Sequence, residues 1–270
     1  MVLSGREFHA ATEPVDVALS FGTSTSSTPK ICANLQNLCP AKFEHVSRET
    51  LALKDTKNLK ELTESLPASF TLSPAQQALF EDYVQLLLEW NPRAGLVSKA
   101  DENASRLIKR HIVESLGLVA TNLLSENAAV LDLGSGGGFP GVPLKIARPD
   151  LKITLLDSRR MKSLFLQEVV QRLNLENAEA VCARAESLDD SFKFRFDFVV
   201  VRAVTSLAKL WQWAIPVLKN DGSLLAQKGG DLDQELKELS SAFPGIAVKK
   251  VNYPAGWDID PTRYVVTIKM

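Results

Sequence analysis

Residues 130–143 read VLDLGSGGGFPGVP, an apolar strand-like run that passes directly into a glycine-rich segment containing two prolines. Glycine costs conformational entropy on folding, but it allows sharp turns and lets the backbone come close to a ligand. The stretch therefore predicts a buried strand that ends in a ligand-binding turn.

Downstream of this stretch, strand-like and helical patterns alternate. Apolar runs at 128–133, 151–157, 178–185, 196–203 and 223–229 predict strands, and the runs at 246–253 and 263–270 can supply two more. Helical patterns lie between them at 161–175, 206–218 and 231–242. This rhythm predicts an α/β fold with a doubly wound, mostly parallel seven-stranded sheet of the Rossmann-like type. In such sheets ligands bind beyond the carboxyl ends of the strands, which is where the glycine-rich turn falls.

Two amphipathic helices are predicted upstream of the sheet. Ser73, Pro74 and Gln76 form a capping signal at the start of the first helix, and Asn91-Pro92 predicts its end. The second helix is expected from Asn103 to Leu124. Residues 1–70 show no sustained periodicity apart from one short helical pattern near 56–65. We therefore expect a weakly structured extension at 1–70, a helical cap at 71–125 and a Rossmann-like domain at 126–270.

Composition excludes several classes of protein. The formal net charge is −1, and the three cysteines have no spacing typical of a zinc site, so we expect reduced thiols and no metal. No apolar run is long enough to span a membrane, and no secretory signal opens the chain. A Ser/Thr-rich tract at 20–30 is typical of organellar transit peptides, but the acids Glu7, Glu13 and Asp16 argue against one. The sequence therefore predicts a cytoplasmic monomer without a membrane partner.

The glycine-rich turn fits two classes of cofactor. Gly136 to Gly141 match G-x-G-x-x-G, the dinucleotide pattern, but Pro140 and Pro143 remove backbone donors that a pyrophosphate needs. The alternative register is Asp132-x-Gly134-x-Gly136-x-Gly138. A carboxylate at the strand tip repels a pyrophosphate and attracts a cofactor that carries sulfonium and ammonium groups. The pattern favours S-adenosyl-L-methionine, with an NAD-dependent oxidoreductase as the alternative.

Two further acids follow the next strands. Asp157 ends the second strand, where a carboxylate can accept both hydroxyls of an adenosine ribose, or can cap the helix that follows. NAD needs the same group, so Asp157 does not separate the two cofactors. Glu186 follows the third strand, where the adenine is expected, and a solvated loop acid is an equally good interpretation.

Several segments together resemble a known family. They are EWNPRAGLVS (89–98), RLIKRHIVES (106–115), VLDLGSGGGFPGVPLKIARPD (130–150), TLLDSRRMKSLFLQEV (154–169), CARAESL (182–188), VVVRAVTSL (199–207) and LLAQKGG (224–230). In order and spacing the chain from about 73 to 270 resembles the bacterial RsmG (GidB) family. That family methylates N7 of a guanine in small-subunit (16S) ribosomal RNA, so the resemblance implies a methyltransferase whose partner is this RNA or the small ribosomal subunit.

The resemblance also implies cofactor positions. They are Gly134 and Phe139 in the glycine-rich turn, Asp157, Ser158 and Arg159 after the second strand, Ala185 and Glu186 after the third, and Arg202 at the end of the fourth. Phe139 is expected against the cofactor or in the core. The chain departs from the family at Gly95, where Asn is usual, and at Glu114, where Asp is usual. A ribosome-assembly factor that keeps the pocket without turnover is therefore a further alternative, as is a methyltransferase with a different acceptor.

The expected chemistry needs no covalent catalyst. N7 of guanine bears no proton, so alignment of the reactants is enough, and we expect no catalytic nucleophile. Cys182 is expected to be a buried apolar residue. Arg202 is the candidate that orients the substrate: it could donate to guanine O6, donate to the cofactor carboxylate, or pair with Asp132 or Glu114. Arg110, His111 and Lys228 are candidates for RNA phosphate contacts, and His111 is more simply interpreted as a core histidine.

Overall fold

A seven-stranded sheet forms the centre of the protein. The computed structural model describes residues 56–270, so the predictions for 1–55, including Cys32 and Cys39, lie outside the described residues. The strands are β1 (Ala129–Leu133), β2 (Lys152–Asp157), β3 (Ala178–Cys182), β4 (Phe196–Arg202), β5 (Leu218–Gly229), β6 (Ala247–Asn252) and β7 (Arg263–Lys269). Their order is β3-β2-β1-β4-β5-β7-β6, with β1 to β5 parallel and β7 antiparallel to both neighbours. The predicted doubly wound, mostly parallel sheet is confirmed.

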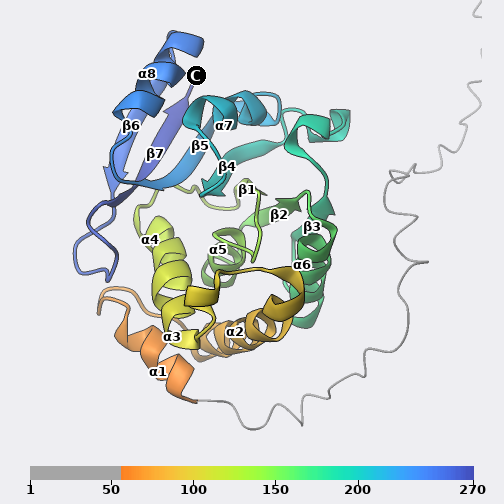
Figure 1. The fold of residues 1–270 in the computed structure, drawn as a ribbon, viewed down its shortest axis with the longest axis vertical. Helices are drawn as coiled ribbons and strands as arrows, with labels where there is room; N and C mark the ends of the chain where they lie inside the picture. Colours follow the sequence, from red (N-terminus) through yellow and green to blue (C-terminus); the bar gives the residue numbers. More distant parts are fainter. Residues whose placement is uncertain (1–55) are drawn as a thin grey trace, which may run out of the picture. The chain divides into compact units, whose positions relative to one another are not determined.

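Helices cover both faces of this sheet. They are α1 (Thr56–Glu64), α2 (Pro74–Ala94), α3 (Ala104–Leu107), α4 (Glu114–Ala120), α5 (Gly141–Ala147), α6 (Arg160–Arg172), α7 (Leu207–Ala214) and α8 (Asp233–Ala242). Figure 1 shows α4, α5 and α6 on one side of the strands, α7 and α8 on the other, and α1 to α3 outside the first group. The short helix predicted near 56–65 is confirmed as α1.

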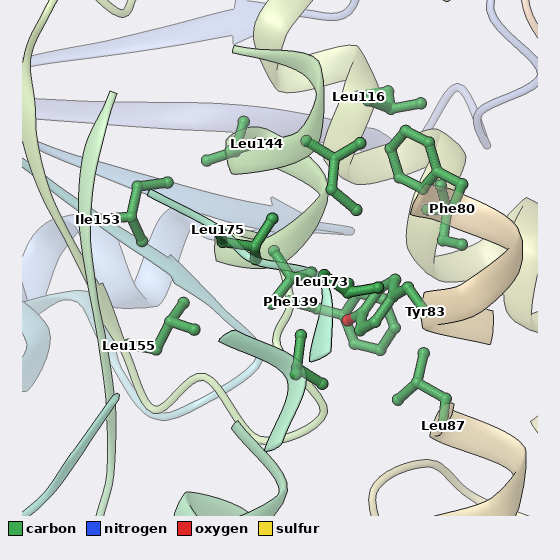
Figure 2. Packing of buried hydrophobic residues seen from close by; sticks show 14 of the residues in the cluster. Phe80, Tyr83, Leu87, Leu116, Phe139, Leu144, Ile153, Leu155, Leu173 and Leu175 are labelled. Atoms are coloured by element: carbon green, nitrogen blue, oxygen red, sulfur yellow. The ribbon is translucent and has the colours of Figure 1, made fainter. Parts of the chain in front are cut away.

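The cap helices and the sheet share one hydrophobic core. Phe80 and Tyr83 of α2 pack in the same cluster as Phe139 of the turn and Ile153 of β2. Figure 2 shows these rings of α2 facing the residues that come from the sheet side. Leu62 of α1 is also buried in this cluster. The glycine-rich turn is therefore held between the sheet and the cap.

The predicted end of α2 at Asn91-Pro92 is wrong, because the helix continues to Ala94. Pro92 lies in the last turn, and Gly95 closes the helix in the left-handed conformation at φ 57°. The side chain of Asn91 accepts hydrogen bonds from the backbone nitrogens of Leu96 and Val97 at 2.8 and 2.9 Å. These bonds hold the chain after the helix, which offsets the bond that Pro92 cannot donate.

Two other boundaries differ from the prediction. The helix expected over 103–124 runs from Ala104 to Ala120 and contains a π-helical segment, η3, at Ile108–Val113. The helix expected over 206–218 ends at Ala214, and β5 begins at Leu218 instead of 223. Pro216 explains the second difference, since it cannot donate the backbone hydrogen bond that would continue the helix, although Ile215 before it keeps helical angles.

Candidate active site

The glycine-rich turn folds back over the carboxyl end of β2. Gly134, Gly136 and Gly138 all adopt positive φ, at 77°, 59° and 92°. The backbone nitrogens of Gly134 and Ser135 both donate to the carbonyl of Leu156, at 2.8 and 2.9 Å. Only glycine adopts these conformations without strain, so the turn explains the composition of the segment.

The three glycines differ in what lies beside them. A Cβ on Gly134 would lie 2.8 Å from Cγ2 of Val204, and one on Gly138 would lie 2.8 Å from the hydroxyl of Tyr83. A Cβ on Gly136 would meet no atom closer than the Lys162 ammonium, at 3.7 Å. Gly134 and Gly138 thus make room for the protein's own side chains, and the backbone beside Gly136 has the most open approach of the three.

Asp132 lies entirely inside the protein, at the end of β1. Its Oδ2 accepts hydrogen bonds from the Ser135 hydroxyl at 2.5 Å and from the Gly141 nitrogen at 2.9 Å. Its Oδ1 is buried and has no hydrogen-bond partner in the described residues. Burial raises the pKa of Asp132 to about 7. A buried acceptor without a donor fits a ligand that brings a cationic donor and does not fit a pyrophosphate.

Asp157 joins the turn to the start of α6. The carboxylate is buried, and it accepts from the Gly136 nitrogen at 2.9 Å and from the Arg159 nitrogen at 2.8 Å. It therefore orders the turn and the residues before α6 together, and each oxygen keeps lone-pair capacity for a further donor. The predicted contact with a ribose remains compatible with this geometry.

The other predicted cofactor residues lie at the same edge of the sheet. Ser158 and Arg159 are exposed after β2, and Ala185 and Glu186 belong to the 3-10 turn η4 (Ala185–Ser187) after β3. The register pairs Asp157 with Cys182, so the two loops begin at the same level. Cys182 is half-buried in β3. The geometry brings these residues next to the glycine-rich turn, and their contacts with a cofactor stay predictions.

From the sequence, Lys162 is expected only as one cation of a basic rim for RNA, with Lys99, Lys109, Arg159 and Arg160, and not as a residue of the cofactor site. It is half-buried in the first turn of α6, and burial lowers its pKa. Its ammonium group lies beside Gly136 and has no hydrogen-bond or ion-pair partner within the described residues. The sequence signal for this placement is that Lys162 lies in the first turn of α6, five residues after Asp157, the acid that ends β2.

Arg202 lies over the Phe139 ring of the glycine-rich turn and reaches into the cap. Its Nη1 donates to the carbonyl of Arg110 at 3.2 Å, and its Nη2 contacts Nδ1 of His111. It also lies 3.8 Å from the carboxylate of Glu114. Burial lowers its pKa, and this acid opposes that effect. Of the predicted partners, the structure brings Arg202 to Glu114, while its contacts with guanine or cofactor stay predictions.

Phe139 and His111 are stacked in the core beneath Arg202. Their ring centroids are 5.0 Å apart with an interplanar angle of 27°, and the Arg202 guanidinium lies 4.9 Å above the Phe139 ring. Burial and the Arg202 charge lower the pKa of His111 to about 4, so its ring is neutral at pH 7. This is the core position that the sequence allowed for both rings, and an uncharged buried histidine offers a phosphate little attraction.

The two remaining candidates for RNA contact already have partners. Arg110 pairs with Asp101 at 3.0 Å, although its side chain is 66% exposed. The Lys228 ammonium is 13% exposed and donates to Glu235 and to the carbonyl of Thr205, both at 2.8 Å. The structure therefore does not present Lys228 as a free cation.

Glu114 connects the cap to the far side of the sheet. One of its oxygens accepts from Nε and Nη2 of Arg263 in β7, at 2.9 and 2.5 Å. Its side chain is 10% exposed, so this ion pair is largely shielded from water. The longer Glu at a position where the family usually has Asp thus has a defined partner.

The described residues contain neither a membrane-spanning helix nor a metal-binding cluster. No helix in this part of the chain is long and apolar enough to cross a membrane. No group of three or more His, Cys, Asp and Glu side chains between residues 56 and 270 is arranged to hold a metal ion. A groove of about 360 Å³ lies at the amino ends of the strands, near Thr154, Glu179 and Arg195, at the sheet edge opposite the glycine-rich turn.

Comparison with known proteins identifies the family. The sequence model described as "rRNA small subunit methyltransferase G" (GidB) matches residues 76–258. "Ribosomal RNA small subunit methyltransferase G" of Desulforamulus reducens is 39% identical over 176 residues, 64% of this chain and 72% of its own length. The protein of the same name from Lachnoclostridium phytofermentans is 37% identical over 203 residues, 73% of this chain and 83% of its own length.

A solved structure is more distant. A SAM-dependent methyltransferase from Aquifex aeolicus aligns with a TM-score of 0.45 at 20% identity, over 62% of this chain and 92% of that one. The assignment therefore rests on the family model and the sequence relatives. The chain belongs to the rRNA small subunit methyltransferase G (GidB) family.

Proposed function

We propose that this protein transfers a methyl group from S-adenosyl-L-methionine to N7 of a guanine in small-subunit ribosomal RNA. The observation that carries the proposal is the buried, unpartnered Oδ1 of Asp132 beneath a turn whose backbone is approachable at Gly136. Asp157 stands on the neighbouring strand, where an adenosine ribose would meet a carboxylate. The names of the relatives, which act on ribosomal RNA, support the choice of acceptor.

The charges of the site residues support this cofactor. Asp132 would face its ammonium or sulfonium charge, Asp157 would accept from its ribose, and the open backbone at Gly136 would lie against it. The bound cofactor supplies an electrophilic methyl group on a positively charged sulfur. The half-buried Lys162 ammonium offers a cation to the carboxylate of the methionine part.

Methylation of guanine N7 needs no general base. N7 of guanine has an exposed lone pair and no proton to lose, so the protein has to align three atoms and exclude competing positions, which contributes several kcal/mol. A base in a folded RNA reaches such a site only when it leaves its stack. The proposal therefore includes an unpaired or flipped guanine, and it assigns no residue as nucleophile.

The test uses the full chain and two independent measurements. Calorimetry compares the binding of S-adenosyl-L-homocysteine with that of NAD. Mass spectrometry of nucleosides then identifies the methylated base in small-subunit RNA incubated with the protein and S-adenosyl-L-methionine. We expect binding of the adenosyl compound only, and 7-methylguanosine in the RNA.

Two variants locate the site. Asp157→Asn replaces one carboxylate oxygen by a donor, and it should weaken S-adenosyl-L-homocysteine binding at least tenfold because the ribose and the Gly136 nitrogen lose their acceptor. Asp221→Asn is the matched control, since this acid is entirely exposed near Lys269. NAD binding in place of the adenosyl compound would overturn the cofactor. Binding without methylation of any RNA would favour the assembly-factor alternative.

The predictions of cellular location and oligomeric state rest on the sequence alone. Action in the cytoplasm, as a monomer, on naked RNA or on the small ribosomal subunit stays a prediction. Methylation of the assembled subunit but not of naked RNA would show which partner the protein recognises.

A further inference from the structure

Three arginines stand out because their guanidinium groups have no partner. Arg159, Arg160 and Arg184 are exposed, and none of them makes a side-chain hydrogen bond, ion pair or cation–π contact in the described part of the chain. Every other arginine among residues 60–270 forms an ion pair with a carboxylate or donates to a backbone carbonyl, as Arg195 pairs with Glu179 at 2.5 Å. The unpaired guanidinium groups are thus confined to three positions.

These three positions lie at one edge of the sheet. Arg159 and Arg160 follow the end of β2, and Arg184 follows the end of β3, its parallel neighbour. Because Asp157 is in register with Cys182, Arg159 and Arg184 each stand two residues beyond a matched pair. Neighbouring strands lie about 4.8 Å apart, so the three positions follow the ends of two adjacent strands. We call this group the β2–β3 arginine surface.

Little negative charge opposes this surface. Asp157 is buried and bonded to backbone nitrogens, and Asp190 is paired with Lys193 at 2.8 Å. Asp189 accepts from the Ser191 nitrogen but keeps its charge, so Glu186 and Asp189 are the exposed acids near Arg184 that have no ion-pair partner in the described residues. The partly buried ammonium of Lys162 is a further cation at this surface. It lies near enough to Arg159 for the charge of that arginine to help lower its pKa. The surface is cationic although the whole chain has a net charge of −1.

We propose that the β2–β3 arginine surface binds the phosphodiester backbone of the RNA next to the target guanosine. This inference rests on the proposed function, because it takes the acceptor to be RNA. A planar guanidinium group without an internal partner is suited to a phosphate, which it can contact through two parallel hydrogen bonds. The surface flanks the turn and Asp157, so RNA bound there would present its neighbouring nucleotide to the cofactor site.

The experiment measures RNA binding as a function of salt. The full chain is saturated with S-adenosyl-L-homocysteine, and the affinity for a labelled small-subunit RNA fragment is measured from 50 to 300 mM KCl. The test variant is Arg160→Gln/Arg184→Gln; Arg159 is left unchanged because its backbone nitrogen holds Asp157. Each lost phosphate contact lowers the slope of log affinity against log salt by about 0.7 for single-stranded RNA, so we expect a decrease of about 1.4. Affinity at moderate salt should fall about tenfold.

Two further variants separate phosphate contact from net charge and from folding. Lys237→Gln/Lys249→Gln removes the same charge from exposed positions on α8 and β6, and its salt slope should equal that of the wild type. Arg160→Lys/Arg184→Lys keeps two cations and should restore most of the slope.

The outcomes distinguish this inference from the proposed function. The phosphate surface is overturned, even if the wild type methylates RNA, by either of two results. One is an unchanged slope in Arg160→Gln/Arg184→Gln, and the other is an equal decrease of the slope in Lys237→Gln/Lys249→Gln. A wild type that binds RNA with the expected slopes but transfers no methyl group overturns the proposed function and leaves the surface supported. Loss of S-adenosyl-L-homocysteine binding in the Gln double variant would show a cofactor role instead.

Discussion

At the scale of single residues, the charges next to the site are set by contacts between distant parts of the chain. Arg202 could be recognised from its sequence position as an arginine that needs a partner at the end of a buried strand. Its partners come from the cap: His111 and Glu114 lie 91 and 88 positions earlier. Arg263, which shares Glu114 with it, lies 149 positions from that acid. No local pattern links such residues, so the sequence offered Glu114 only as one of several possible partners of Arg202 and did not predict the contacts with His111 and Arg263.

The neutral state of His111 predicts a pH dependence of stability. Its pKa is about 4 in the folded protein and 6.5 in an unfolded chain, so the unfolded state binds the proton more tightly. This contribution to stability is present above pH 6.5 and is lost as the pH falls towards 4. Between pH 7 and pH 4.5 the loss is about 2–3 kcal/mol. Asp132, whose pKa is raised to about 7, has the opposite effect over this range.

The variant His111→Gln isolates the histidine because it keeps Asp132 and cannot take up a proton. We expect the difference in free energy of unfolding between wild type and variant to shift by about 2–3 kcal/mol in favour of the variant on going from pH 7 to pH 4.5. Urea denaturation at a series of pH values measures this difference. Parallel curves for the two proteins would show that the pKa of His111 is the same in the folded and unfolded states.

At the scale of elements, the end of α2 explains one departure from the family. Gly95 closes the helix at φ 57°, and a Cβ there would meet nothing within 4 Å. The choice of residue at position 95 is therefore limited by the backbone conformation and not by contacts with neighbouring side chains. Asn, which the family usually has here, is the residue that most readily replaces glycine in the left-handed conformation. The departure keeps the same backbone geometry.

This geometry predicts a ranking of substitutions. Gly95→Asn should change the free energy of unfolding by less than about 0.5 kcal/mol, while Gly95→Ala should lower it by about 1 kcal/mol. Chemical denaturation of the two variants beside the wild type gives the ranking. If alanine and asparagine were equally costly, the left-handed cap would not be what this position requires.

Elements also show where sequence patterns stop being informative. The strands were predicted because apolar runs such as 196–203 are long and bounded by turn residues. The π-helical segment Ile108–Val113 has no comparable signal, since its apolar spacing is that of an ordinary helix. The sequence predicted that Asp132 faces the cofactor but not that it also bonds the turn, because a residue at a strand end can do either. Here one oxygen bonds the turn and only the other is left without a partner.

At the scale of the whole molecule, the shared core predicts that cap and sheet unfold together. Residues of α2, α4, the turn and β2 belong to one buried cluster, and the described residues 56–270 lie within one compact unit. A ligand bound at the turn should therefore stabilise both parts. At a concentration of S-adenosyl-L-homocysteine 100 times its dissociation constant, the gain is about 2.7 kcal/mol.

The measurement follows unfolding with two probes. Circular dichroism reports the helices, and fluorescence reports four tryptophans, of which Trp90 in the cap and Trp211 behind the sheet are buried. We expect one coincident transition for both probes, moved by the same amount when the ligand is added. A cap transition that does not move with the ligand would show that the cap is an independent unit.

The hydrogen bond from Tyr83 to the carbonyl of Gly137, at 2.5 Å, has a consequence for how the protein is made. The helix that carries this tyrosine leaves the ribosome before the strand and turn it supports have been synthesised. Until they emerge, the apolar face of α2 has nothing to pack on, and such a surface is prone to association with other chains. Competence to bind ligand is then acquired late in translation, when the helix made early closes on the turn made afterwards.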